Sequence, residues 1–183
     1  MTSPVSDSVT GVPIRPARPA DAGALVELIR SAYRGDTSRA GWTSEADLVE
    51  GERISAGQVR AMIERSGSLM LIAETEAGIV ACCQLENRGA GLTYFGTFAV
   101  SPQQQGAGLG RQLMAEAELQ AVATFAARRL EMTVLAQQDK LIAYYERRGF
   151  RRTGETRPFP ADPRYARPLR DDLHFVVLAK ALP

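Results

Sequence analysis

The glycine-rich segment at 105–110 limits the fold more than any other stretch, because it lies between an apolar run and a long helical pattern. Its sequence is QGAGLG, with glycine at 106, 108 and 110. Glycines let consecutive backbone N–H groups turn toward one anion, and a helix that starts there adds a favourable dipole. The segment therefore predicts a phosphate cradle, or else a flexible turn between a strand and a helix.

Two familiar phosphate-binding motifs are excluded by the residues around these glycines. A dinucleotide-binding GxGxxG that begins at Gly106 needs glycine at 111, where the chain has Arg111. A P-loop needs lysine and then serine or threonine directly after its last glycine, and neither follows Gly110. A cradle of another kind and a plain turn both remain open.

Hydrophobic periodicity on both sides of the segment predicts a mixture of strands and helices. Apolar runs predict strands at 12–18, 91–100, 130–136, 150–155 and 173–182, and a hairpin at 68–86 that is broken by TEAG. Spacings of three and four predict helices at 21–34, 43–50, 55–67, 109–128 and 138–149. This order of elements is typical of an α/β fold.

One domain over residues 12–183 accommodates all of these elements. We expect a central mixed, mostly antiparallel, twisted sheet of about six to seven strands, flanked by helices. Residues 1–11 lack periodicity and are expected to form a flexible tail. The stretch 157–171 is rich in proline and arginine, which predicts a long loop without regular structure.

Charge and composition indicate which partners to expect. The 22 Lys and Arg residues balance 21 Asp and Glu, so neither nucleic acid nor an anionic membrane is predicted as a partner. No signal-peptide pattern and no run of about 18 apolar residues is present, which favours a cytoplasmic protein. Cys82 and Cys83 are adjacent on a predicted strand and so point to opposite faces, which disfavours a disulfide. With His174 as the one histidine, no metal site is expected.

In two stretches, the first of which includes the glycine-rich segment, the sequence resembles a known family, the GCN5-related N-acetyltransferases (GNAT). Residues 105–110 match the family's Q/R-x-x-G-x-G/A signature, and FAVSP at 98–102 resembles the strand end that introduces it. Downstream, LEMTVLAQQDKLIAYYERRGF resembles the second signature, in which a strand leads to a helix that carries a tyrosine and closes on Gly-Phe. The two signatures lie in order within 98–154, so the resemblance implies a GNAT-like domain.

The resemblance implies acetyl-CoA as the acyl donor, with acetyl or a longer acyl group left open. Backbone groups of Phe98, Ala99 and Val100 would pair with the pantetheine arm, as an added strand does. The N–H groups of the cradle would hold the pyrophosphate, and these come from Gln105, Gly106, Ala107, Gly108, Leu109, Gly110 and Arg111. Many relatives have asparagine where this chain has Gln138, which either replaces the asparagine contact with pantetheine or faces water.

The same alignment gives the proton donor, whereas the candidate bases are titratable residues on the predicted strands. Tyr145 stands at the position of the family tyrosine, so we expect its phenol to donate a proton to the departing thiolate, although aromatic residues on helices also serve as core. For the general base we favour Glu86, with Glu131 and His174 as alternatives. A simpler role for each also stays open, such as a solvent-facing position for Glu131.

Acceptor recognition is expected in the loop AGWTSEADLVEGER, which begins at residue 40. Within it, Trp42, Glu45 and Arg53 are the candidate substrate-binding residues, because an aromatic ring with charges of both signs can bind an amine beside an apolar group. The predicted activity is transfer of an acetyl group to the primary amine of a small molecule, by direct attack in a ternary complex. An acyl-CoA-binding sensor without turnover and a protein N-acetyltransferase are the alternatives, and a homodimer stays open.

Overall fold

A computed structural model describes residues 11–39 and 44–183 of the chain. The predicted flexible tail spans residues 1–11, of which only Gly11 is described. The candidate Trp42 lies outside the described residues. The helices are α1 Ala22–Tyr33, α2 Gly35–Arg39, α3 Ala56–Glu64, α4 Leu109–Phe125 and α5 Asp139–Glu146, with short 3-10 turns at Pro19–Asp21 and Pro102–Gln104. The strands are β1 Ile14–Pro16, β2 Val49–Glu50, β3 Ser68–Thr75, β4 Gly78–Gly89, β5 Leu92–Val100, β6 Arg129–Leu135, β7 Arg151–Pro158, β8 Arg167–Pro168 and β9 His174–Ala181.

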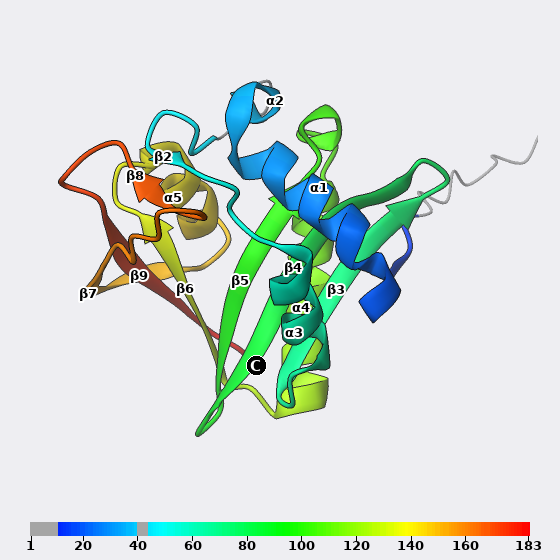
Figure 1. The fold of residues 1–183 in the computed structure, drawn as a ribbon. Coiled ribbons are helices and arrows are strands. Elements are labelled where there is room, and N and C mark those ends of the chain that lie inside the picture. Colours follow the sequence, from blue (N-terminus) through cyan, green and yellow to red (C-terminus); the bar gives the residue numbers. More distant parts are fainter. Residues whose placement is uncertain (1–10, 40–43) are drawn as a thin grey trace, which may run out of the picture.

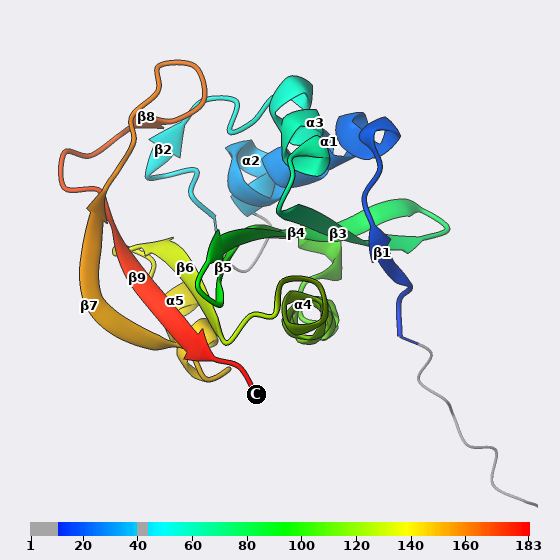
Figure 2. The ribbon, with the colours of Figure 1, turned by 90° about the horizontal axis from the view of Figure 1, so that it is seen from below.

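The main sheet has seven strands in the order β1-β3-β4-β5-β6-β9-β7. Strands β5 and β6 run parallel, and every other neighbouring pair recorded in this sheet is antiparallel. Helices α1 and α3 cover one face and α4 covers the other, as both views show (Figures 1 and 2). This confirms the predicted α/β fold with a mixed, mostly antiparallel sheet.

Neighbouring side chains in the central parts of β3 and β4 point to opposite faces, which gives the sheet a core on each face. Leu71 packs with α4 on one side, while Ile72 packs with α1 on the other. Cys83 and Cys82 follow the same rule, each fully buried in a different cluster, and both thiols are free. Neighbouring strand residues point to opposite faces, so this arrangement is the one that the sequence predicts.

The two halves of the sheet separate at the parallel pair. The register between β5 and β6 covers only Leu92 to Tyr94, and beyond it the strands diverge (Figure 1). Strand β5 also carries an extra residue, because Cys82 pairs with Ala99 while Gln84 pairs with Gly96. Thr97, inside this irregularity, adopts a left-handed φ of 47°. The second half of β5 therefore has an open edge that faces the gap between the halves.

A small second sheet joins the two halves, and it corrects two predictions. Strand β2 pairs with β8 through Val49 to Pro168 and Glu50 to Arg167. The predicted helix at 43–50 is wrong, because the described part of that segment consists of turns followed by β2. The prediction that 157–171 lacks regular structure is also wrong at its ends, where β7 reaches Pro158 and β8 forms. Two-residue strands have no periodicity of their own, so they depend on contacts that are distant in sequence.

The predicted helix at 109–128 is correct in place but ends at Phe125. Ala126 adopts a left-handed conformation, and its N–H closes the last turn on the carbonyls of Ala121 and Val122. This helix begins at the glycine segment and packs its buried face, which includes Leu113 and Ala117, on β4 and β5. The glycines are thereby fixed beside the open edge of β5.

Candidate functional site

The candidate site is a cavity of about 840 Å³ between the open edge of β5, the start of α4 and helix α5. Its lining residues come from segments that are far apart in sequence: Ala32, Tyr33, Ser44, Glu45, Phe98, Ala99, Val100, Pro102, Gln105, Gly106, Ala107, Gly108, Gly110, Arg111, Gln138, Leu141, Tyr144, Tyr145, Arg147 and Arg148. The structure thus brings together Tyr145, Glu45 and every predicted cofactor-binding residue except Leu109. Leu109 is buried in the core beneath α4.

The glycine segment presents a row of unused backbone donors. Among the described hydrogen bonds, none is donated by the backbone N–H groups of residues 106–111, and the first helical bond runs from the N–H of Gln112 to the carbonyl of Gly108 at 3.0 Å. Gly106 and Gly108 have φ values of 89° and 82°, a region that favours glycine. These donors at the start of a 17-residue helix form a ready anion site.

Gly110 is glycine for a different reason. Its φ is ordinary, but a Cβ there would lie 3.1 Å from the hydroxyl of Tyr144 and 3.2 Å from Cζ of Phe98. The absence of a side chain therefore lets α4 approach α5 and β5 closely. The Gln105 side chain adds a further link, since its Nε2 donates to the carbonyl of Val100 at 3.0 Å.

Three arginines line the cavity together with the glycine segment. Arg111 was part of the predicted cradle, whereas Arg147 and Arg148 were not predicted. The guanidinium of Arg148 lies over the Tyr144 ring, 3.4 Å from its centroid, and donates to the Tyr144 carbonyl at 2.8 Å. Its Nε is buried and has no hydrogen-bond partner within the described part of the chain. Positive charge beside unused N–H donors fits a ligand that carries several phosphate charges.

Tyr145 lies on the wall of the cavity and is 4% exposed. Its ring packs edge-on against Phe150 and Tyr144, with centroids at 5.9 Å and 5.4 Å. Burial, and then the neighbouring Tyr33 and Tyr144, raise the pKa of the Tyr145 phenol well above its usual value. The hydroxyl therefore stays protonated at physiological pH and can act as a donor.

The opposite end of the cavity carries charges of both signs. The Tyr33 hydroxyl donates to the carbonyl of Phe98, and Glu45 forms an ion pair with Arg34. Both side chains of this pair are largely buried, at 14% and 9% exposed. Glu45 is the one carboxylate among the described lining residues. Gln138, at the N-cap position of α5, donates from its side chain to the carbonyl of Ser44 at 3.4 Å, so the start of α5 and the segment around Ser44 meet at this end.

The residues that the sequence suggested as bases lie outside the lining. Glu86, on β4, forms ion pairs with Arg65 at 3.5 Å and Arg88 at 3.2 Å. Glu131 does not face solvent: it is 9% exposed and pairs with Arg157 at 2.7 Å. His174 is exposed, with its Nδ1 3.0 Å from the carbonyl of Asp172. None of these side chains contributes to the described cavity wall.

Residues 11–39 and 44–183 provide neither a membrane-spanning helix nor a cluster of metal ligands. No helix in that part of the chain has the length and apolar character needed to span a bilayer. No group of three His, Cys, Asp or Glu side chains is placed there to hold a metal ion.

The comparisons with known proteins agree with this fold. A family model described as an acetyltransferase (GNAT) domain matches residues 42–159, which is more than half of the chain. The protein therefore belongs to the GNAT acetyltransferase family. No curated protein matches it in sequence.

Solved structures share the fold along nearly the whole chain. The structure of smu.2055 from Streptococcus mutans UA159 has a TM-score of 0.70 at 20% identity, covering 93% of this chain and 99% of that chain. The ribosomal-protein-S18-alanine N-acetyltransferase from Escherichia coli has a TM-score of 0.68 at 16% identity and covers 93% of each chain. The structure of yncA from Salmonella typhimurium with its cofactor acetyl-CoA has a TM-score of 0.68 at 17% identity and covers 95% of each.

Proposed function

We propose that the protein is an N-acetyltransferase that moves an acetyl group from acetyl-CoA to the primary amine of a small molecule. One observation carries this proposal: a single cavity connects the unused N–H groups of residues 106–111 with the phenol of Tyr145. The first feature suits the phosphates of a CoA ester, and the second suits proton donation to a leaving thiolate. Acetyl-CoA, when bound, supplies the activated acyl group.

The donor would be held by groups that the fold leaves without partners. The N–H groups of residues 106–111 would bind the pyrophosphate, with Arg111, Arg147 and Arg148 supplying charge. Beyond Tyr94, the edge of β5 that faces β6 has no recorded strand pairing. The backbone of Phe98–Val100 would therefore pair with the amides of the pantetheine arm, and Gln138 would contact it from α5.

In the proposed reaction, the amine loses one proton and the thiol gains one, with Tyr145 between them. The neutral amine forms the new C–N bond while the C–S bond breaks. The sulfur receives a proton from Tyr145, and the phenol is reprotonated by the proton that the amine nitrogen releases. Because the pKa of Tyr145 is raised by burial, the phenol enters the reaction in the form that can donate.

The acceptor would approach from the end of the cavity where Tyr33 and Glu45 lie, because the phosphates occupy the other end. Glu45 uses its Oε2 for Arg34. Its Oε1 makes no recorded hydrogen bond in the described structure, which leaves it available to an ammonium group. We therefore propose that Glu45 binds the incoming amine and receives its first proton. The role of Glu86 as base stays a prediction that depends on a connection through water.

A small acceptor is favoured over a protein by the β2-β8 sheet. The N–H of Arg53 donates to the carbonyl of Tyr165 at 3.0 Å, and the N–H of Leu169 donates to that of Leu48 at 2.9 Å. These bonds hold the two loops together where an extended peptide would need open space. Cytoplasmic location and a homodimer remain predictions that accompany this proposal.

The test is a coupled measurement of binding and turnover. Acetyl-CoA is expected to raise the thermal midpoint of the protein, and CoA thiol is expected to be released when a panel of small primary amines is added. Protection without thiol release from any amine or peptide would favour the sensor. Release with peptides alone would favour a protein acetyltransferase. Absence of protection would contradict the donor site itself.

A further inference from the structure

Arg53 is a partly buried guanidinium without an acidic partner. It forms no ion pair in the described structure, and its Nε is buried without a hydrogen-bond partner. Its one recorded side-chain contact is with the ring of Tyr33, whose centroid lies 4.7 Å from Cζ. Arg53 is not itself among the residues that line the described cavity, but the Tyr33 ring beneath its guanidinium is. Buried or half-buried charges in proteins are normally paired, so an uncompensated guanidinium beside the cavity wall indicates an anion that arrives with a ligand.

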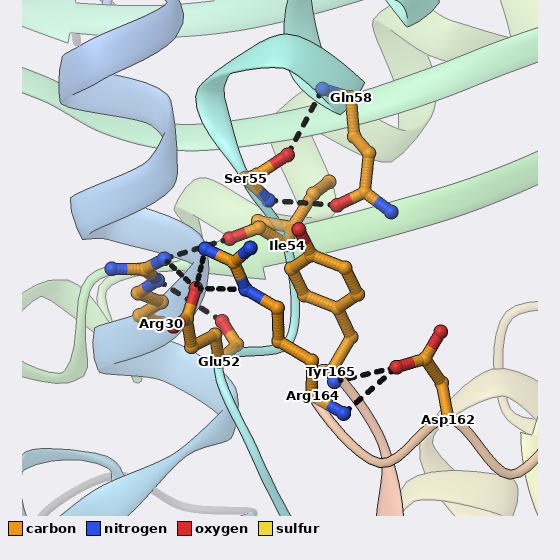
Figure 3. Close-up of polar contacts among 8 residues, drawn as sticks. All are labelled: Arg30, Glu52, Ile54, Ser55, Gln58, Asp162, Arg164 and Tyr165. Atoms are coloured by element: carbon orange, nitrogen blue, oxygen red, sulfur yellow. Dashed lines mark hydrogen bonds and ion pairs between the residues drawn. The ribbon is translucent and has the colours of Figure 1, made fainter.

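The nearest carboxylate in sequence is already engaged elsewhere. Glu52 accepts from Arg30 at 3.0 Å and from Arg164 at 3.4 Å, as Figure 3 shows. Arg30 also donates to the backbone carbonyls of Glu52 and Ile54, at 3.0 Å each. These contacts hold the residues on both sides of Arg53 while leaving its own side chain unpaired.

The backbone of Arg53 is fixed by the facing loop. Its φ is 66°, in the left-handed region that residues other than glycine seldom adopt. The N–H of Arg53 donates to the Tyr165 carbonyl, and Asp162 in turn fixes that loop by accepting from the N–H groups of Arg164 and Tyr165 at 2.8 Å and 3.1 Å (Figure 3). An unfavourable conformation that is held by several contacts is typical of a functional position.

Arg53 and Glu45 flank the same tyrosine at the acceptor end. Burial raises the pKa of the Tyr33 hydroxyl, and within that environment Arg53 acts to lower it while Glu45 acts to raise it. Both residues lie close to Tyr33, since the Arg53 guanidinium lies over its ring and the N–H of Glu45 donates to its carbonyl at 3.3 Å. Arg34 balances Glu45, so the described charges around Tyr33 leave one positive charge in excess, that of Arg53.

We infer that the acceptor carries an anionic group, such as a carboxylate or phosphonate, that binds Arg53 while its amine binds Glu45. This inference rests on the proposed acetyltransferase function and narrows its substrate class to small amino acids and their analogues. A guanidinium can form two parallel hydrogen bonds with a carboxylate, which fixes both the position and the direction of the acceptor. The same contact would orient the amine toward the thioester.

The experiment compares matched acceptors on matched variants. Each acceptor pair consists of an amino acid and the amine that lacks its carboxylate, for example leucine and isopentylamine. The wild type is compared with Arg53→Met, with Arg53→Lys, and with Arg60→Met as a control at an exposed arginine of α3. Thiol release gives kcat/KM, and the thermal midpoint with and without acetyl-CoA verifies that each variant folds and binds the donor.

The wild type is expected to prefer the carboxylated member of at least one pair. Arg53→Met should lower kcat/KM for that member by about 30-fold or more, with little change for its decarboxylated partner. Arg53→Lys should lose less, since lysine keeps the charge but not the paired contact. Arg60→Met should match the wild type.

Three outcomes would overturn the inference. In the first, the wild type has equal kcat/KM for both members of every pair. In the second, Arg53→Met lowers kcat/KM equally for both members. The third is protection by acetyl-CoA with turnover confined to amines that lack an acidic group. In all three cases the proposed function stands, whereas no protection of the wild type by acetyl-CoA would contradict both proposals.

Discussion

The ring of Tyr145 on α5 lies 6.3 Å, between centroids, from the ring of Phe98 on the open edge of β5. Residues 47 positions apart in sequence thus meet at the wall of one cavity. The contact fixes the phenol beside the backbone that would pair with the pantetheine arm. It joins the two sequence signatures of the family in a single site.

Replacement of Tyr145 by phenylalanine is expected to lower kcat by about 100-fold, because the leaving sulfur loses its proton donor. The hydroxyl makes no recorded hydrogen bond in the described structure, so stability and acetyl-CoA affinity should change little. Steady-state thiol release and a binding titration measure the two effects separately. Tyr144→Phe is the matched control, since the Tyr144 hydroxyl lies beside Gly110 instead. An equal loss of kcat in both variants would remove Tyr145 from its assigned role.

Glu45→Gln and Glu86→Gln distinguish the two proposed bases. Glu45 lines the cavity, whereas Glu86 is paired with two arginines away from it. We expect Glu45→Gln to lower kcat/KM by about 10-fold or more, with the largest deficit below the pKa of the acceptor amine. The pH profile of kcat/KM for the wild type and both variants measures the size of the deficit and its dependence on pH. A larger deficit in Glu86→Gln would return the base to the residue that the sequence favoured.

Arg147 should contribute to the discrimination between CoA and dephospho-CoA. It is exposed, lines the cavity and has no recorded ion pair within the described residues. Arg147→Gln is expected to weaken CoA binding by about 5-fold, with a smaller effect on dephospho-CoA, which lacks the 3′-phosphate. Binding titrations of CoA and dephospho-CoA, at low and at high salt, measure the change in Kd for each ligand. Identical losses for both ligands would place Arg147 away from that phosphate.

The buried thiols predict a loss of stability at alkaline pH. Burial raises the pKa of Cys82 to about 12, while an unfolded thiol titrates near about 8.5. Between these values the unfolded chain binds fewer protons than the folded one, so the free energy of unfolding falls as pH rises, by about 1.4 kcal/mol per pH unit for each such group. Urea unfolding under reducing conditions from about pH 7 to about pH 10, a range that begins below the titration of the unfolded thiol and ends above it, measures the slope.

Cys82→Ala supplies the control for this slope. The variant should be less stable at neutral pH, because a buried side chain is shortened. Its stability should nevertheless fall less steeply with pH, since one titrating group is gone. Parallel curves for the wild type and the variant would show that Cys82 does not carry the effect.

The sequence predicted the main elements around the cavity, because each has its own local signal. Two apolar runs broken by TEAG in 68–86 predicted the hairpin of β3 and β4, and spacings of three and four predicted α4 and α5. The glycines predict a phosphate cradle, which stays a prediction, and the structure gives Gly110 a further role, since it allows close packing against Tyr144. Local periodicity and turn chemistry are sufficient for features of this kind.

The acceptor side could not be predicted in the same way. Strands β2 and β8 are two residues long and form only because loops more than 100 residues apart meet. The burial of Glu131 depends on Arg157, which lies 26 positions away. Arg147 and Arg148 look like an ordinary charged helix end until α5 is placed beside the cradle. Contacts of this kind are set by the tertiary fold, which no local pattern encodes.

A titration of acetyl-CoA into three proteins tests the central claim most directly. The wild type is compared with Gly108→Asp and with Gly154→Asp, a control glycine on β7 that has a similar φ of 86°. A Cβ would meet no atom within 4 Å at Gly154, and at Gly108 only the Arg111 guanidinium at 3.7 Å, so both positions have room for a side chain. We predict that Gly154→Asp binds acetyl-CoA as the wild type does, while Gly108→Asp loses about 100-fold or more in affinity, because a carboxylate would stand among the N–H donors meant for phosphate. Equal affinity in Gly108→Asp and Gly154→Asp would contradict the assignment of residues 106–111 as the phosphate cradle.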